Sequence, residues 1–482
     1  MASFRYERLP VADGTFLAFE DPNSHMTIGA TLVFEAGPLM TPDGGLDIER
    51  LRAHIASRLH QIPRYRQRLD WVPIEGHPVW VDDDHFTLGY HVRHTALPRP
   101  GDERALKRLT ARVMSQQLDR GKPLWEAWFV EGLEDGRCGL IIKTHHCMTD
   151  GVAAVELATV LLSPTPDATV DEAPRWTPRP APTGSELLRS ELARVVGAPW
   201  RLGVAARDFV ARATRGLTVR QSLGALWEIS RAGLRTAADT PLNRPIGPHR
   251  RVDWISIDLG GVKTVKNRLG GTVNDVVLAV VAGALRRFLH RRRMSTDGVD
   301  FRTVVPVSVR DVEERGMMNN RASAWIISLP IGERDPRRRH TRVRQTTEHM
   351  KRTHQARGVQ ILGEIAGLAG SLTFLHLGIR LMQLVNPYNM IVTNVPGPPI
   401  PLYLLGARLL AGYPMVPLFE NQALGVAVSS YGGRLFFGFN ADWDLVPDLG
   451  YFARDVETSF DELVAVATDT EVRTRPGRRA SQ

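Results

Sequence analysis

The sequence predicts an α/β protein built from two halves that a linker joins. Two observations predict this class. Strand-like and helix-like apolar periodicities alternate along the chain, and a proline-rich stretch without apolar periodicity, residues 163–184, interrupts them. The chain has 482 residues, 43% apolar and 23% charged, which is the composition of a globular protein with roughly two to four domains.

The first half begins with a strand at residues 25–35. Asp47 then has the position of an N-cap for a helix whose Leu51, Ile55 and Leu59 share one face. The remaining expected elements are a helix at 105–118, strands at 126–131 and 138–144 joined by a turn at 134–137, and a helix at 151–162.

Residues 185–235 have a helical pattern punctuated by arginines. Two interpretations are open for them: a basic amphipathic segment that lies on an anionic membrane, or a helix that packs on the body with solvated arginines. The second half then predicts strands at 252–259, 301–309, 323–329, 389–393, 423–429 and 435–439, and helices at 273–289, 336–357 and 447–465.

These elements divide the chain into four parts. We expect an N-terminal half over residues 1–162, a proline-rich linker and basic helical connector over 163–248, a C-terminal half over 249–469, and a disordered tail over 470–482.

Composition limits the classes of function. Cys138 and Cys147 are the only cysteines, which excludes a disulfide framework and cysteine-rich metal sites. The net charge of +9 is spread along the chain without a nucleic-acid-binding motif, so we expect no nucleic-acid partner. Charged residues near the N-terminus predict no secretion signal, and the longest apolar run, 276–285, is shorter than the roughly 20 residues that a membrane span needs.

The chemistry is concentrated in the motif HHxxxDG, formed by His145, His146, Asp150 and Gly151. Adjacent strand residues point to opposite faces, so one histidine is expected to face a cavity while the other supports the strand end. A lone imidazole suits general-base catalysis, taking a proton from a hydroxyl or amine that attacks an acyl carbon. Asp150 is expected to hold the loop or pair with an arginine, and Gly151 to supply a corner or a backbone N–H near the reacting atom.

Two other chemistries compete with this interpretation. Cys147 follows the base directly and is an alternative nucleophile, although a residue adjacent to the base points away from it if the strand continues. Residues 82–85 (Asp-Asp-Asp-His), with His91 and His94, are the other cluster of metal-ligating types, but such carboxylate runs are typical of a solvated turn. We therefore expect no metal site.

At HHCMTDG the chain resembles the HHxxxDG acyltransferase superfamily, which includes chloramphenicol acetyltransferase, peptide-synthetase condensation domains and polyketide-associated acyltransferases. Pro123-Leu124-Trp125 and Asn274-Asp275 resemble the PLW and ND motifs of the bacterial wax ester synthase/diacylglycerol acyltransferases. Residues 63–69, 91–94, 305–310 and 394–398 match that family as well, and the resemblance runs from about residue 16 to 461.

The resemblance implies two chloramphenicol-acetyltransferase-like halves with mixed sheets around a central tunnel. It implies that His146 is the general base, that His145 and Asp150 shape the site, and that Pro123, Leu124 and Trp125 are structural. The second half would contribute Asn274, Asp275, Arg310 and Asn320 to substrate binding or the shape of the site.

Alternatives stay open for several of these residues. Asn274 and Asp275 could instead serve the first turn of their helix, and Arg310 could pair with Asp150 or with solvent. Asn319 occupies a position where the family often has glycine, which bears on chain-length preference.

The implied activity is O-acyl transfer to a lipid alcohol, with long-chain acyl-CoA as cosubstrate and no cofactor or metal. Diacylglycerol giving triacylglycerol is the first choice of acceptor, and a fatty alcohol giving wax ester is the second. The alternatives are a condensation or transesterification enzyme that uses a carrier protein, and a non-catalytic lipid-surface protein on the same scaffold. The expected location is cytoplasmic, peripheral on the inner membrane face or on lipid droplets.

Overall fold

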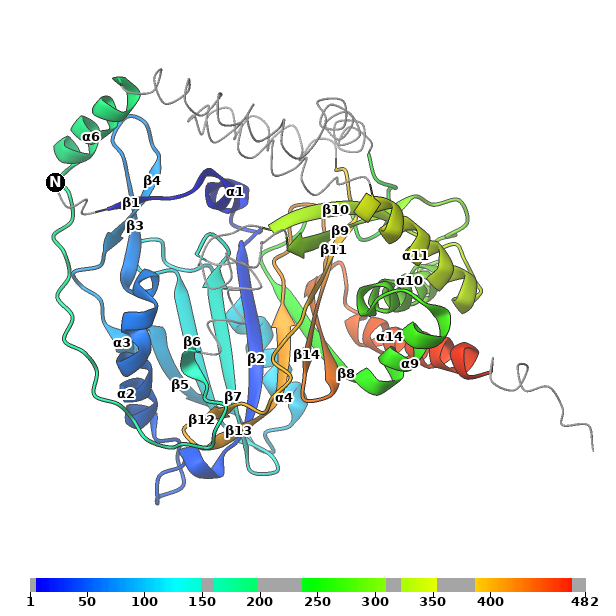
Figure 1. The fold of residues 1–482 in the computed structure, drawn as a ribbon, viewed down its shortest axis with the longest axis horizontal. Coiled ribbons are helices and arrows are strands. Elements are labelled where there is room, and N and C mark those ends of the chain that lie inside the picture. The colour runs from blue at the N-terminus through cyan, green and yellow to red at the C-terminus, as the bar shows by residue number, and fades with distance from the viewer. Residues whose placement is uncertain (1–5, 149–159, 197–235, 309–321, 353–385, 470–482) are drawn as a thin grey trace, which may run out of the picture.

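Two six-stranded mixed sheets lie side by side at the centre of the molecule (Figure 1). The structure is a computed structural model of the chain, and it describes residues 6–148, 160–196, 236–308, 322–352 and 386–469. The predicted α/β class with two halves is confirmed, since helices pack on sheets in both parts of the chain.

The first sheet has the strand order β12-β13-β2-β7-β6-β5. It is antiparallel throughout, except that β5 runs parallel to β6. Its strands from the first half are β2 (Thr27–Glu35), β5 (Val92–Ala96), β6 (Trp125–Leu133) and β7 (Arg137–His145). The helices of this half are α1 (Val11–Phe19), α2 (Ile48–Arg58), α3 (Leu88–His91) and α4 (Glu103–Met114), with short 3-10 turns η1 (Gly37–Leu39), η2 (Leu59–Gln61) and η3 (Pro63–Arg66).

Helix α2 begins where the sequence predicts. The Asp47 carboxylate accepts a hydrogen bond from the Arg50 N–H at 3.0 Å, which satisfies one of the backbone donors that the first helical turn leaves free. The apolar face of α2 is buried through Leu51 and Ile55. The predicted N-cap is therefore confirmed.

The C-terminal part of the chain supplies two strands to the first sheet. Strand β13 (Ala407–Met415) pairs antiparallel with β2, placing Met415 opposite Gly29, and β12 (Tyr403–Leu404) pairs with β13. The sequence did not predict these strands. The two sheets thus draw on chain segments that cross between the halves, and the four-part division of the chain stays a prediction.

The second sheet has the order β10-β9-β11-β14-β15-β8, and helices of the described part of this half cover one of its faces (Figure 1). Its strands are β8 (Arg250–Asp258), β9 (Phe301–Ser308), β10 (Ala322–Leu329), β11 (Met390–Val395), β14 (Leu424–Tyr431) and β15 (Arg434–Asp442). The helices are α9 (Leu259–Leu269), α10 (Val273–Arg291), α11 (Pro336–Arg352) and α14 (Leu449–Thr468).

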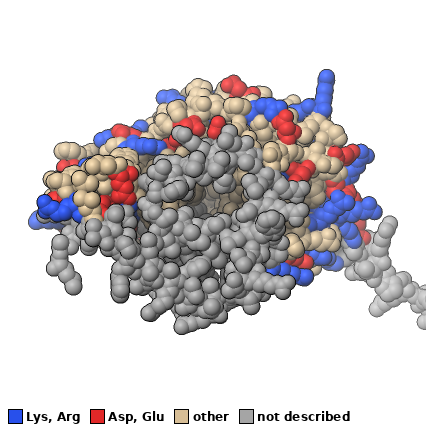
Figure 2. All heavy atoms as spheres, turned by 90° about the horizontal axis from the view of Figure 1, so that it is seen from above, with Lys and Arg blue, Asp and Glu red and all other residues tan. Residues whose placement is uncertain are grey.

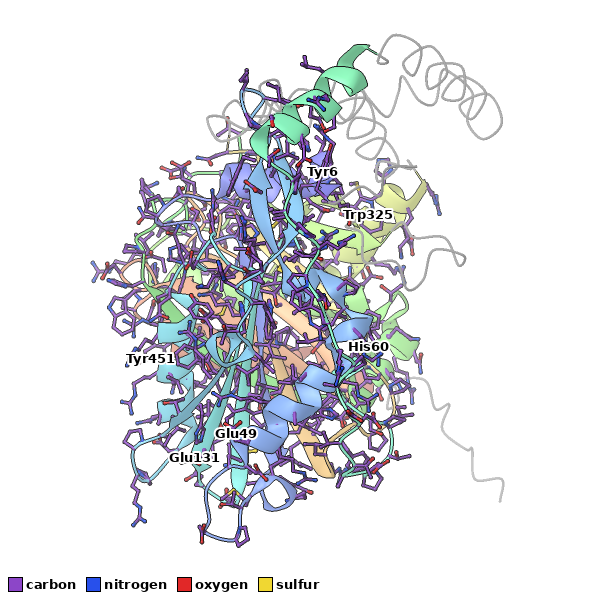
Figure 3. The ribbon with its side chains drawn as sticks, turned by 90° about the vertical axis from the view of Figure 1, so that its left-hand side faces the viewer. Tyr6, Glu49, His60, Glu131, Trp325 and Tyr451 are labelled. Atoms are coloured by element: carbon purple, nitrogen blue, oxygen red, sulfur yellow. The ribbon has the colours of Figure 1, made fainter. Side chains whose placement is uncertain are left out.

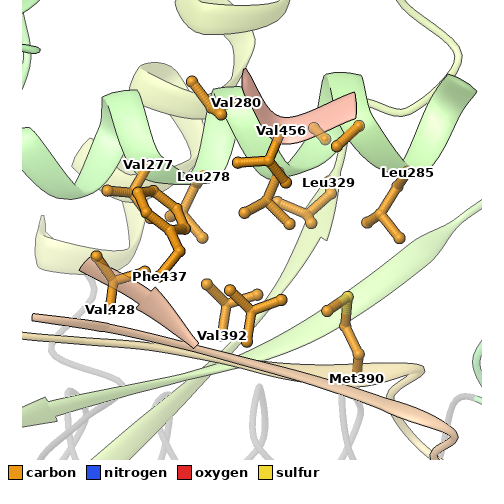
Figure 4. Close-up of a cluster of buried hydrophobic side chains, with 14 of the residues drawn as sticks. Val277, Leu278, Val280, Leu285, Leu329, Met390, Val392, Val428, Phe437 and Val456 are labelled. Carbon is orange, nitrogen blue, oxygen red and sulfur yellow. The ribbon is translucent and has the colours of Figure 1, made fainter. Parts of the chain in front are cut away.

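Helix α10 forms the centre of the second core. Val277, Leu278 and Leu285 point from it toward Val392 of β11 and Phe437 of β15 (Figure 4). Burying each such side chain stabilises the fold by about 1.5–3 kcal/mol, which explains why the longest apolar run of the sequence lies here.

Within the described residues no single helix has the length and apolarity of a membrane span. Only α9 and α10 taken together, with a bend of 100° between them, meet both criteria.

The proline-rich linker runs along the outside of the first half (Figure 1). Helix α6 (Gly184–Val196) follows it and packs Leu187 against Val79 and Val81 on a small three-stranded sheet. Tyr6, labelled in Figure 3, shares a hydrogen bond with Ser190 of α6. The strands of this sheet are β1 (Glu7–Arg8), β3 (Gln67–Trp71) and β4 (Pro78–Asp82). Most of the helix expected at 151–162, the rest of the basic connector and the tail lie outside the described residues.

Candidate active site

Strand β7 carries the two histidines to one end of the first sheet. His145 is its last residue and lies opposite Thr27 of β2. The His145 N–H donates to the Leu124 carbonyl at 2.9 Å, and the His146 N–H donates to the Met26 carbonyl at 2.8 Å. The residues that directly precede β6 and β2 therefore fix the backbone of the histidine pair.

The His145 ring points into the protein. The residue is 1% exposed, and its Nδ1 accepts a hydrogen bond from the Cys147 N–H at 3.1 Å. Its Nε2 lies 3.6 Å from Oε2 of Glu20, whose carboxylate also accepts a hydrogen bond from Arg120 Nε at 2.9 Å. His145 thus supports the turn that follows β7.

The His146 ring is half-buried. The Phe16 ring of α1 stacks on it, with the two planes 8° apart and the centroids 3.8 Å apart. This contact fixes the plane of the imidazole and covers one of its faces. The arrangement can present a basic nitrogen to a bound hydroxyl group, which is the geometry that general-base catalysis needs.

The cysteine beside the pair lacks the surroundings of a nucleophile. Cys147 is 2% exposed. Burial raises the pKa of its thiol well above the usual value, and the nearby carboxylates of Asp13 and Glu20 raise it further. A thiol attacks an acyl group as the thiolate, which these surroundings disfavour. The geometry therefore favours imidazole chemistry over covalent cysteine chemistry.

Lys143 precedes the histidines and is completely buried. Its ammonium donates to the Val113 carbonyl at 3.0 Å and to the Gln116 carbonyl, at the end of α4. Burial lowers the pKa of Lys143 to about 8. The charged group thus ties α4 to β7 behind the site.

The PLW segment packs next to the pair. Leu124 is fully buried, and its carbonyl is the acceptor for His145. The Trp125 indole N–H donates to the Tyr65 carbonyl at 2.8 Å, and its ring stacks on His91 with centroids 4.7 Å apart. These contacts give Leu124 and Trp125 a packing role beneath the histidines.

The ND segment lies at the start of α10 in the second half. Thr272 and Asp275 form a reciprocal capping box, and Asp275 is 1% exposed. Its second carboxylate oxygen accepts from the Thr347 hydroxyl of α11 at 2.6 Å. These bonds tie two helices together, so Asp275 shapes the second half, whereas Asn274 is half-buried beside it.

Four predicted site residues, Asp150, Gly151, Arg310 and Asn320, lie outside the described residues, and their roles stay predictions. In the alternative metal cluster, the Asp82 carboxylate pairs with the Arg179 guanidinium at 2.9 Å, and the Asp83 carboxylate accepts a hydrogen bond from the His85 N–H at 3.1 Å. No group of three or more histidine, cysteine, aspartate or glutamate side chains suited to a metal ion occurs among those residues.

A hollow opens near the middle of the face shown in Figure 2. Near the site, the Phe19 ring of α1 meets the Phe419 ring of the second half edge to face, with centroids 5.3 Å apart. Both line a small pocket with Tyr388 and Gln422. Helix α1 therefore contacts both the histidine pair and the opposite half of the molecule.

Sequence reasoning missed Phe16, Glu20 and Arg120. Phe16 lies on α1, which has no side-chain cap and contains a glycine, so its helical pattern is weak. Glu20 directly follows that helix, and no local pattern marked it.

Known proteins share both the sequence and the fold. Residues 9–277 match the wax ester synthase/diacylglycerol acyltransferase catalytic domain, and residues 318–464 match the WS/DGAT C-terminal domain. The probable diacylglycerol O-acyltransferase tgs1 of Mycobacterium tuberculosis is 35% identical over 473 residues, which cover 97% of this chain and 98% of that protein. For tgs2 of the same organism, the identity is 34% over 390 residues, covering 80% and 83%.

Solved structures of related proteins have the same fold as this chain. The wax ester synthase/diacylglycerol acyltransferase from Marinobacter aquaeolei VT8 superposes with a TM-score of 0.68 and 26% identity, covering 96% of this chain and 100% of that chain. The first condensation domain of the calcium-dependent antibiotic synthetase superposes with a TM-score of 0.61, covering 97% of each chain, and at 17% identity it shows the fold alone.

The fold is thus that of the chloramphenicol-acetyltransferase-like proteins, with mixed sheets in two halves. Within that class, the chain belongs to the wax ester synthase/diacylglycerol acyltransferase family. It is an enzyme, an acyltransferase of lipid synthesis.

Proposed function

We propose that the enzyme transfers a long-chain acyl group from acyl-CoA to the hydroxyl of diacylglycerol, giving triacylglycerol, and also accepts fatty alcohols to give wax esters. The observation that carries the proposal is the half-buried His146 imidazole, stacked on Phe16 at the end of β7, in a chain of this family. The names of the relatives support diacylglycerol as the first acceptor.

The proposed chemistry is a single displacement. His146 takes the proton of the acceptor hydroxyl as its oxygen attacks the thioester carbonyl. The resulting oxyanion needs hydrogen-bond donors, for which we propose a backbone N–H near Gly151. The carbon–sulfur bond then breaks, and the thiolate of CoA takes the proton back from His146. No metal, cofactor or acyl-enzyme is required.

The decisive experiment measures ester formation from radiolabelled palmitoyl-CoA with diacylglycerol and hexadecanol offered separately. Turnover by the wild type should fall by about 10²–10⁴-fold in His146→Ala if the residue acts as the general base. His60→Ala is a matched control, because His60 is an exposed histidine of the same half. Its turnover should equal that of the wild type.

The possible results discriminate between the alternatives. Ester lost in His146→Ala supports the mechanism, and the two yields rank the acceptors. Ester that persists in His146→Ala refutes His146 as the base. No ester with either acceptor refutes the proposed substrates and points to a carrier-bound donor or to a scaffold that binds lipid without reacting.

We also propose that the enzyme works at a lipid surface, on the inner membrane face or on lipid droplets. Its proposed acceptors are insoluble in water, and residues 185–235 have the basic helical pattern that anionic lipid attracts. The protein should co-sediment with anionic liposomes at low salt and dissociate at high salt. Failure to co-sediment at low salt refutes this proposal.

A further inference from the structure

A buried carboxylate lies behind the histidine pair. Glu20 directly follows α1, and its side chain is 3% exposed. The Arg120 guanidinium donates to its Oε2 from Nε at 2.9 Å and also from Nη2. The same oxygen lies 3.6 Å from Nε2 of His145, which makes no other polar contact within the described part of the chain.

The contacts of His145 define which ring nitrogen carries the proton. Its Nδ1 accepts the Cys147 N–H at 3.1 Å, so Nδ1 holds a lone pair. In a neutral imidazole the proton then sits on Nε2, and this N–H faces the Glu20 carboxylate. The carboxylate therefore favours the same tautomer that the turn requires.

Glu20 carries its negative charge at neutral pH. Burial alone raises the pKa of its carboxyl, but His145 and Arg120 lower it by more, and the pKa lies below its ordinary value. Asp13 and Arg64 are the other charged groups that act on the adjacent Cys147.

The same helix also contacts the second histidine. Phe16 of α1, four residues before Glu20, stacks on His146. The turn that bears His146 is closed by the Met148 N–H, which donates to the His145 carbonyl at 3.0 Å. One short helix thus fixes the ring of His146 directly and its backbone through His145.

We propose that Glu20, held by Arg120, is a positioning residue: it fixes the tautomer and orientation of His145 and thereby the turn that presents His146. This inference rests on the proposed function, in which His146 is the base.

Glu20→Gln tests the proposal, because it keeps the shape of the side chain and removes its charge. We expect kcat for ester formation to fall by about 10- to 100-fold with little change in KM, since a misplaced base slows the chemical step more than binding. The acid limb of the kcat/KM profile reports protonation of the proposed base, His146. It should move to lower pH, because losing the nearby negative charge of Glu20 disfavours the imidazolium form of this base. Glu20→Asp, which keeps the charge, should restore part of both.

Glu126→Gln is the matched control. Glu126 is a buried carboxylate on β6, in the sheet that carries His145, and it pairs with Arg93 at 3.0 Å. No hydrogen bond or ion pair joins it to His145 or His146 in the described part of the chain. Breaking this pair should lower the melting temperature as much as Glu20→Gln does, while kcat and the pH profile stay at wild-type values.

A second measurement does not depend on turnover. Nuclear magnetic resonance of isotope-labelled histidine reports the tautomer of each ring, and the His145 signal is assigned by its loss in His145→Ala. The wild type should show the Nε2–H form, and Glu20→Gln should reduce its population.

Unchanged kcat and an unchanged tautomer in Glu20→Gln would overturn the proposal. So would a loss of activity that Glu126→Gln reproduces, because that loss would reflect stability alone. If the wild type forms no ester, the proposed function fails, whereas the tautomer result still decides the role of Glu20.

Discussion

The capping box at the start of α10 allows a structural role to be separated from substrate binding. Asp275 is buried, and its carboxylate accepts three hydrogen bonds: from the Thr272 N–H at 2.7 Å, the Thr272 hydroxyl at 2.9 Å and the Thr347 hydroxyl at 2.6 Å. Asn274, the other member of the segment, is half-buried. If Asp275 serves the helix, replacing it should affect stability far more than turnover.

The expected size follows from these bonds. A hydrogen bond to a charged group contributes about 1.5–3 kcal/mol, and loss of an N-terminal cap costs about 1 kcal/mol. The three bonds share one carboxylate and do not add fully, so Asp275→Ala should destabilise the second half by about 3–5 kcal/mol. For a unit of this size, that loss lowers the melting temperature by roughly 6–20 °C.

Thermal melts followed by circular dichroism, together with ester turnover at 25 °C, test the reasoning. Asp275→Ala should have a lower melting temperature than the wild type, yet at temperatures where it is folded its turnover should stay within a few-fold of the wild-type value. Thr347→Val removes one of the three bonds and should give a smaller loss, about 1–2 kcal/mol. Wild-type melting combined with lost turnover in Asp275→Ala would refute the structural role and place the carboxylate at the substrate.

Three further predictions concern single contacts. Phe16→Leu keeps the apolar volume but loses the stack on His146, so kcat should fall up to about tenfold with an unchanged melting temperature; a wild-type kcat would show that the stack does not orient the base. Cys147→Ser should keep turnover within a few-fold, and iodoacetamide should label native Cys147 slowly, whereas abolished turnover would restore covalent catalysis. Asp82→Asn should lose about 1–2 kcal/mol at pH 7 because the half-exposed Arg179 screens part of the pair. Burial raises the pKa of Asp82, but hydrogen bonds from Arg179 outweigh it and hold the pKa at about 2. The stability that the ion pair contributes is therefore complete above about pH 4 and is lost as pH falls toward 2. If the difference in unfolding free energy between wild type and Asp82→Asn does not shrink from about pH 7 to 3, the assignment is wrong.

Elements with strong local patterns were predictable. Helix α2 has an N-cap and an apolar face, and α10 has a continuous apolar run, so the sequence placed both close to their observed bounds. Strand β7 was expected from its apolar run into the two histidines, and it ends at the first of them, His145.

Elements that depend on distant partners were not predictable in the same way. Strand β13 was not predicted, because Gly412 and Pro414 weaken its strand pattern, and it forms by pairing with β2. Helix α1 has nine residues and a proline rather than a capping side chain before it, so its stability comes from what it packs against.

The short motifs in the sequence were sufficient to assign the family and to single out His146, because the residues that carry that information are neighbours in the chain. The surroundings of the histidines arise differently. Arg120 meets Glu20 across 100 positions of sequence, and α1 brings Phe16 onto His146. Side-chain chemistry is encoded locally, but the orientation and charge of a catalytic group depend on packing between distant segments, and that packing forms only when the chain folds.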